Sequence, residues 1–246
     1  ANSITIAAPA TLDLNGFVIS DNSGRSPLTA HGTLKLKGTA DQKNWFVPSN
    51  PSDDKINLQS TSTVIYYDNS TANIWGGTYY KLQAQNRDKL VTGGVPITVE
   101  STFKVTHTTP SSTLEIDTGT ASQTYKGDID GSTNNLKFTA NLLTTMNSTS
   151  RNIKAADITV TGNWDNNARI TTKTIEVQGL SGLQSDSGDI FVAGNFTVSK
   201  FIQNRGNLTF NGTGTQTLST QSSDSKIKNL VINATASVKL GSNITI

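Results

Sequence analysis

A short phrase in which apolar residues alternate with a hydroxyl residue recurs along this chain and limits what the chain can fold into. The phrase is Ile-Thr-Ile or a close variant, and Gly, Asn or Asp usually stands next to it. Alternation with a period of two is the pattern of a β-strand, whereas an amphipathic helix repeats every 3.6 residues. We therefore predict an all-β protein from phrases at 4–6, 97–99, 158–160, 196–198, 208–210 and 244–246.

Longer segments repeat as well. Residues 207–218 match residues 63–74 in the placing of their apolar residues, and a third copy begins at Leu114. The copies suggest a composite period of roughly 45 to 50 residues, which is typical of propellers or solenoids. Strands this short favour solenoid coils of about 20 to 25 residues, two to each period, over propeller blades. We expect one domain over residues 1–246 with about ten coils.

The corners between strands are rich in Gly, Asn and Asp, which we attribute to positive φ angles at the turns. Four segments interrupt the alternation and are expected to be longer protruding loops. Only the window 142–146 has any helical character, and its Thr and Asn content argues against a helix. The four expected loops are 39–55, 117–134, 141–156 and 178–189.

Charge and cysteine content exclude several classes of function. Charged residues make up 15% of the chain, the net charge is +2, and no block of like charge occurs, so a nucleic-acid partner is not expected. The chain has no cysteine and only two histidines, His31 and His107, which excludes disulfides and thiolate zinc sites. Both histidines are interpreted as solvated loop residues.

No apolar stretch approaches the roughly 20 residues of a membrane-spanning helix. The numbered chain starts with Ala1 rather than methionine, which fits cleavage of a secretory leader after small residues. We therefore expect a secreted protein without a membrane span.

Several phrases carry a resemblance to a known class of protein. Residues 11–16, 62–66 with 76–82, and 207–218 resemble the repeats of large secreted, adhesin-like bacterial surface proteins. That resemblance implies a right-handed parallel β-helix and an extracellular or cell-surface location. It brings no catalytic motif.

Paired acidic residues were considered as catalytic or metal-binding groups. Glycosidase chemistry needs two carboxylates held roughly 5 to 10 Å apart on a rigid surface. The pairs here lie in expected loops rather than at corresponding positions of successive coils, and the segment 128–132 lacks the further ligands of a calcium loop. No catalytic residue, metal or cofactor is therefore predicted, and a polysaccharide lyase or hydrolase is a remote alternative. The pairs are Asp53 and Asp54, Asp128 and Asp130, and Asp186 and Asp189.

Aromatic residues offer a second kind of site, because sugar rings stack on aromatic faces. In the pairs Tyr66-Tyr67 and Tyr79-Tyr80 one ring has to face inward and the other outward, since strand side chains alternate. The candidate carbohydrate contacts are Trp45, Tyr67 and Tyr80. They support the alternative that the chain is a surface adhesin or a carbohydrate-binding rod.

The two ends of the sequence carry nearly the same strand phrase, and neither shows a polar capping segment. Solenoids normally hide their terminal coils with such caps. Open ends that match each other predict head-to-tail assembly of identical subunits, which gives a fibre rather than a ring. The expected interface consists of Ser3, Ile4, Thr5, Ile6, Asn243, Ile244, Thr245 and Ile246.

Overall fold

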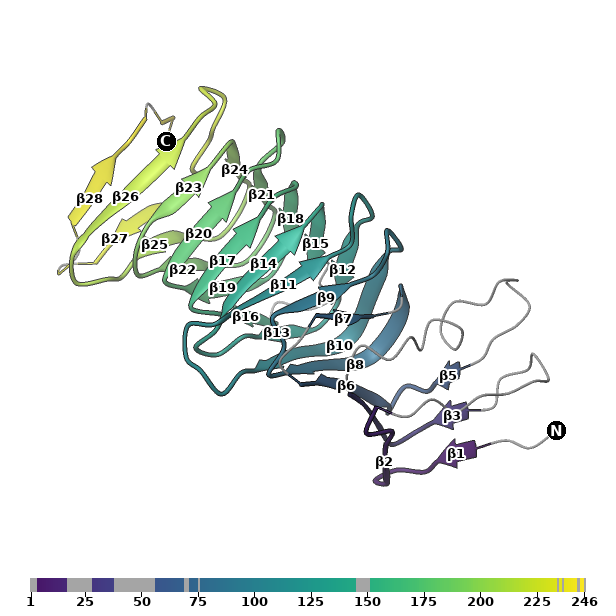
Figure 1. The fold of residues 1–246 in the computed structure, drawn as a ribbon. Helices are drawn as coiled ribbons and strands as arrows, with labels where there is room; N and C mark the ends of the chain where they lie inside the picture. The colour runs from purple at the N-terminus through teal and green to yellow at the C-terminus, as the bar shows by residue number, and fades with distance from the viewer. Residues whose placement is uncertain are drawn as a thin grey trace.

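The computed structural model describes residues 4–16, 28–37, 56–68, 71–74, 76–144, 151–233, 235, 237–242 and 244–245. This part of the chain is all-β without a helix, and its strands stack as a parallel β-solenoid of about nine turns (Figure 1). Register partners are 18 positions apart at Leu183 and Phe201 and 28 apart at Leu28 and Ile56. The predicted parallel solenoid is therefore confirmed. Within the described residues no helix has the length and apolarity to cross a bilayer.

Each turn visits three faces in a fixed order, which we call faces 1, 2 and 3. Face 1 contains β1 (Ile4–Ile6), β3 (Leu28–Ala30), β5 (Ile56–Leu58), the first parts of β8 (Gly77–Gln85) and β10 (Ile97–Thr106), β12 (Gln123–Tyr125), β15 (Leu142–Thr144), β18 (Trp164–Asn166), β21 (Leu183–Ser185) and β24 (Phe201–Gln203).

Face 2 contains the later parts of β8 and β10 together with β2 (Thr11–Asp13), β4 (Thr33–Lys37), β6 (Thr63–Tyr67), β13 (Asp128–Asp130), β16 (Asn152–Lys154), β19 (Arg169–Thr172), β22 (Ile190–Val192), β25 (Leu208–Phe210) and β27 (Leu230–Ile232). Face 3 contains β7 (Ala72–Asn73), β9 (Lys89–Val91), β11 (Thr113–Asp117), β14 (Asn135–Thr139), β17 (Asp157–Val160), β20 (Thr174–Val177), β23 (Phe196–Val198), β26 (Thr215–Thr220) and β28 (Ser237–Leu240).

The core is built from rows of inward side chains that stack along the axis of the solenoid. On face 2 one row is apolar in every described turn, because the register places the same strand position above itself each time. This row consists of Leu12, Leu34, Val64, Leu82, Phe103, Ile129, Ile153, Ile170, Ile190, Leu208 and Leu230.

Face 1 departs from this rule and explains a wrong prediction. From β12 to β24, each of its three-residue strands points one apolar and one polar side chain inward, and the polar ones are buried: Gln123, Thr144, Asn166, Ser185 and Gln203. Without an apolar alternation these strands cannot be distinguished from loops in the sequence. Two expected loops, 117–134 and 178–189, are therefore regular turns of the solenoid containing β12, β13 and β21, and 141–156 contains β15 and β16.

The composite repeat is only half right. Residues 63–74 and 207–218 both run from face 2 to face 3, as β6 with β7 and as β25 with β26. The third copy, beginning at Leu114, starts on face 3. The sequence match therefore aligned a face 3 strand with the face 2 strands β6 and β25, and this copy is wrong. The repeating unit is a single turn. In the window 142–146 residues 142–144 form β15, and the rest of that window and the loop 39–55 lie outside the described residues.

Candidate functional site

The C-terminal end of the solenoid leaves inward positions uncovered. Ile232 stacks on Phe210 and Leu240 on Leu218, and both lower residues are fully buried. Ile232 is nevertheless 47% exposed and Leu240 55% exposed. They occupy core rows but have no described turn above them, so the end presents an apolar cross-section.

The backbone edges at both ends are also unpaired on one side within the described residues. At the C-terminal end β27 pairs only with β25 and β28 only with β26. At the N-terminal end β1 pairs only with β3 and β2 only with β4. An open strand edge is a template for another strand of the same geometry.

The residues expected at the interface fall into different environments. Ile4 is 36% exposed, whereas Ile6 is 4% exposed and already packed within its own chain. Thr5 and Thr245 are exposed, and Ile244 packs partly against the core. Ser3, Asn243 and Ile246 lie outside the described residues.

A polar cluster joins the first three turns on face 2. The Tyr67 hydroxyl donates to Asp13 Oδ1 at 2.6 Å, and Lys35 Nζ lies 3.0 Å from Asp13 Oδ2 and 4.6 Å from the centre of the Tyr67 ring. Burial, the hydrogen bond to Asp13 and the nearby carboxylate charges together raise the pKa of Tyr67 to about 12, with burial the largest cause. Burial also opposes ionisation of Asp13, but hydrogen bonds from Tyr67 and Asn15 and the Lys35 ammonium outweigh it, so the pKa of Asp13 is lowered.

The tyrosine pairs divide as expected, but the outward rings do not form a platform. Tyr66 and Tyr79 are buried, with hydroxyl oxygens 3.3 Å apart. Tyr67 pairs in register with Gln85, which is five positions from Tyr80 on β8, or about 16 Å along the strand. Trp45 lies outside the described residues.

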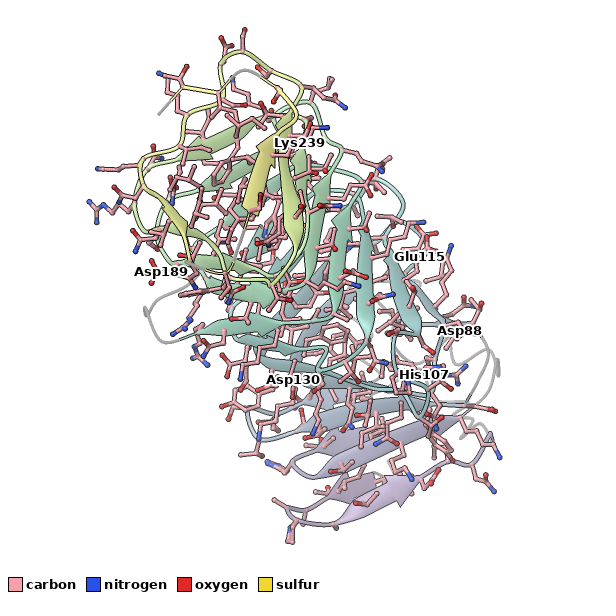
Figure 2. The ribbon with its side chains drawn as sticks, turned by 90° about the vertical axis from the view of Figure 1, so that its left-hand side faces the viewer. Asp88, His107, Glu115, Asp130, Asp189 and Lys239 are labelled. Carbon is pink, nitrogen blue, oxygen red and sulfur yellow. The ribbon has the colours of Figure 1, made fainter. Side chains whose placement is uncertain are left out.

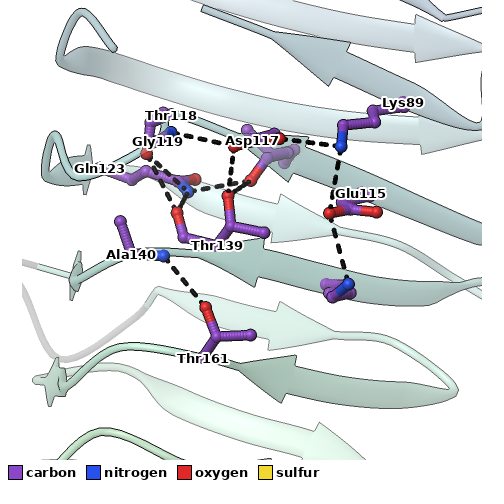
Figure 3. Close-up of polar contacts among 11 residues, drawn as sticks. Lys89, Glu115, Asp117, Thr118, Gly119, Gln123, Thr139, Ala140 and Thr161 are labelled. Carbon is purple, nitrogen blue, oxygen red and sulfur yellow. Dashed lines mark hydrogen bonds and ion pairs between the residues drawn. The ribbon is translucent and has the colours of Figure 1, made fainter.

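A ladder of ion pairs runs along the outside of face 3 (Figure 3). Lys89 Nζ lies 2.8 Å from Asp117 Oδ2 and 3.4 Å from Glu115 Oε1, and Glu115 also pairs with Lys137 at 3.3 Å. The Lys89 hydrogen bond is the main cause that holds the pKa of Asp117 at about 2. The ladder ties three successive turns together and is structural.

The acidic pairs considered from the sequence serve the backbone. Asp128 Oδ1 accepts the Asn152 amide at 2.9 Å, and Asp130 Oδ1 accepts the amide and hydroxyl of Ser132. Figure 2 shows Asp130 and Asp189 at separate places on the molecule. Asp53 and Asp54 lie outside the described residues, and in the described part no three His, Cys, Asp or Glu residues gather as a metal site.

Asp186 and Asp189 have similar turn-to-turn roles. Asp186 accepts hydrogen bonds from the side chains of Gln184 and Asn204, while Asp189 Oδ1 accepts the Asn207 amide at 2.9 Å. Burial raises the pKa of Asp165, and the charge of Asp186 raises it further. These carboxylates hold corners together rather than converge on a shared cavity.

The two histidines are not associated with a catalytic arrangement. His107 Nδ1 accepts the Thr109 amide at 3.1 Å, and its Nε2 lies 3.6 Å from the exposed Asp88 carboxylate (Figure 2). His31 is exposed, and its backbone amide donates to the Ile6 carbonyl.

Comparison of the chain with models of protein families, with curated proteins and with solved structures finds no match.

Proposed function

We propose that this chain is an extracellular structural subunit that assembles head to tail into a fibre or surface layer by β-strand addition. The main support is the exposure of Ile232 and Leu240 at positions where the turn directly beneath carries a fully buried Phe210 or Leu218. Burying a Leu or Ile stabilises by about 1.5–3 kcal/mol, and covering these half-exposed side chains contributes roughly half of that each. The extracellular setting rests on the repeat style of the sequence.

A second copy fits this end because its first turn continues the same rows. Leu12 begins the face 2 row that ends at Leu230, and Leu14, 6% exposed, occupies the other inward position. Stacking of one copy on another would extend these rows without a change of side-chain type. The contact is heterologous, so it repeats without closing.

Assembly is tested by placing carboxylates on the uncovered end. The double variant Ile232→Asp with Leu240→Asp should remain folded by circular dichroism, because both side chains are half-exposed, but it should not form filaments in electron microscopy. Desolvating two unpaired carboxylates at the joint is unfavourable by several kcal/mol.

The matched control is Leu180→Asp, because Leu180 is 97% exposed in a corner between β20 and β21 far from both ends. This variant should form filaments as the unmodified chain does. The proposal is wrong if the unmodified chain stays monomeric at high concentration, or if the double variant assembles equally well.

A further inference from the structure

At the C-terminal end, face 1 has one more stacked segment along the axis of the solenoid than faces 2 and 3 have. We call each position in such a stack a level. Lys226 and Thr245 form an isolated parallel bridge, and the Ile227 amide donates to the Thr245 carbonyl at 3.0 Å. Faces 2 and 3 end one strand earlier, at β27 and β28. The segment around Thr245 therefore occupies a level that the other two faces do not reach.

The N-terminal turn begins on the same face. β1 lies on face 1 and is followed by β2 on face 2. When β2 of a second copy lies beside β27, Leu12 stacks on Leu230 and Leu14 on Ile232. Because β1 precedes β2 within one turn, β1 then arrives at the level of Ile244 and Thr245. Two segments cannot occupy that position together.

The two segments present the same side chains. Ile4-Thr5-Ile6 and Ile244-Thr245-Ile246 have the same sequence, and both threonines are exposed. Ile6 is buried in β1 and Ile244 packs partly against the core, so each segment has an isoleucine that faces inward. An incoming β1 matches the place beside Lys226 as well as the C-terminal segment does.

We infer that the joint between copies is a strand exchange, in which β1 of the incoming copy displaces the segment around Thr245 from its place beside Lys226. The inference rests on the proposed function. The C-terminal segment is then a self-cap. A segment of the same chain has an effective concentration on the order of millimolar. In dilute solution the segment around Thr245 therefore stays bound beside Lys226. At higher concentration the incoming copy displaces this segment, because its β2 and Leu14 also cover Ile232.

The exchange is tested by removing the self-cap. A chain shortened by residues 243–246, and separately the full chain with Ile244→Asp, should form filaments at a concentration about tenfold lower than the unmodified chain, because displacement no longer opposes assembly. Simple stacking of the ends predicts the reverse, since the same changes would then destroy the interface. Ile4→Asp places a charge in the incoming β1 strand. It should abolish filaments in the full chain and in the shortened chain alike.

Engineered cysteines locate the joint, because the chain has no cysteine of its own. In an equimolar mixture, a chain with Thr5→Cys should cross-link through a short bifunctional thiol reagent to a chain with Lys226→Cys, and not to a chain with Thr245→Cys. Filaments that instead join position 5 to position 245, or that are lost on shortening, overturn the exchange and leave the proposed function standing. Absence of filaments from both the full and the shortened chain overturns the proposed function itself.

Discussion

Asparagine and aspartate side chains contribute to this fold mainly by linking one turn to the next. In six places a side-chain oxygen accepts a backbone amide from a residue 18 to 24 positions further on. Positive φ, which the sequence pattern predicts for these residues, occurs among the described Asn and Asp residues at Asn15, Asp68 and Asn86. The acceptors are Asn86, Asp128, Asn141, Asn163, Asp189 and Asn195.

Asp117 gives a prediction at the residue scale. Its carboxylate accepts from Lys89, from the Gly119 amide at 2.9 Å and from the Thr139 hydroxyl at 3.0 Å, and these bonds lower its pKa from 3.8 to about 2. A depressed folded pKa stabilises the native state above the unfolded value, and that contribution is lost as pH falls through 3.8 towards 2.

Chemical denaturation should therefore show the unmodified chain losing about 1 kcal/mol more between pH 4 and pH 2 than Asp117→Asn, after allowance for partial solvent screening. Equal losses in both proteins would contradict the role given to this carboxylate.

At the scale of the elements, the corners between strands set how closely successive turns approach. Gly127 lies between β12 and β13, where a Cβ atom would be 1.2 Å from the backbone oxygen of Ser101 in the turn below. No side chain fits at that distance. Gly214, before β26, has nothing within 4 Å of the same position.

Gly127→Ala should therefore lower the free energy of unfolding by more than about 3 kcal/mol or prevent folding. Gly214→Ala should change it little or raise it by up to about 1 kcal/mol, because alanine restricts the unfolded chain. Thermal unfolding of the two variants provides the comparison, and similar melting temperatures would show that the corners between turns are loosely packed.

At the scale of the whole molecule, each turn contacts only its neighbours, so stability is greatest in the middle. The central strands β14, β17 and β20 have a paired strand on both sides, whereas β1, β2, β27 and β28 have one on a single side within the described residues. End strands therefore open most easily.

Hydrogen exchange should be slowest in the amides of β14, β17 and β20 and fastest in the four end strands when the chain is monomeric. In filaments the amides of β27 should become protected, because β27 then lies between two strands. Uniform protection along the monomer would indicate a single cooperative unit instead of a stack that opens from its ends.

The period-two alternation in the sequence determined the all-β class and much of the face 2 and face 3 core, because backbone geometry alone sends alternate side chains inward. Leu34, Leu36, Leu114 and Ile116 were predictable in this way. Matching phrases at the two ends also identified them as candidate interfaces.

Only the tertiary structure decided the rest. The face 1 strands β12, β15 and β18 are invisible in the sequence because Gln123, Thr144 and Asn166 point inward. Burial of such polar groups depends on partners contributed by other turns or corners. Thr144 Oγ1, for example, donates to Asn166 Oδ1 of the next turn at 2.9 Å. Likewise, the face on which each end phrase lies follows from the count of turns, which places β1 and the segment around Thr245 on the same face.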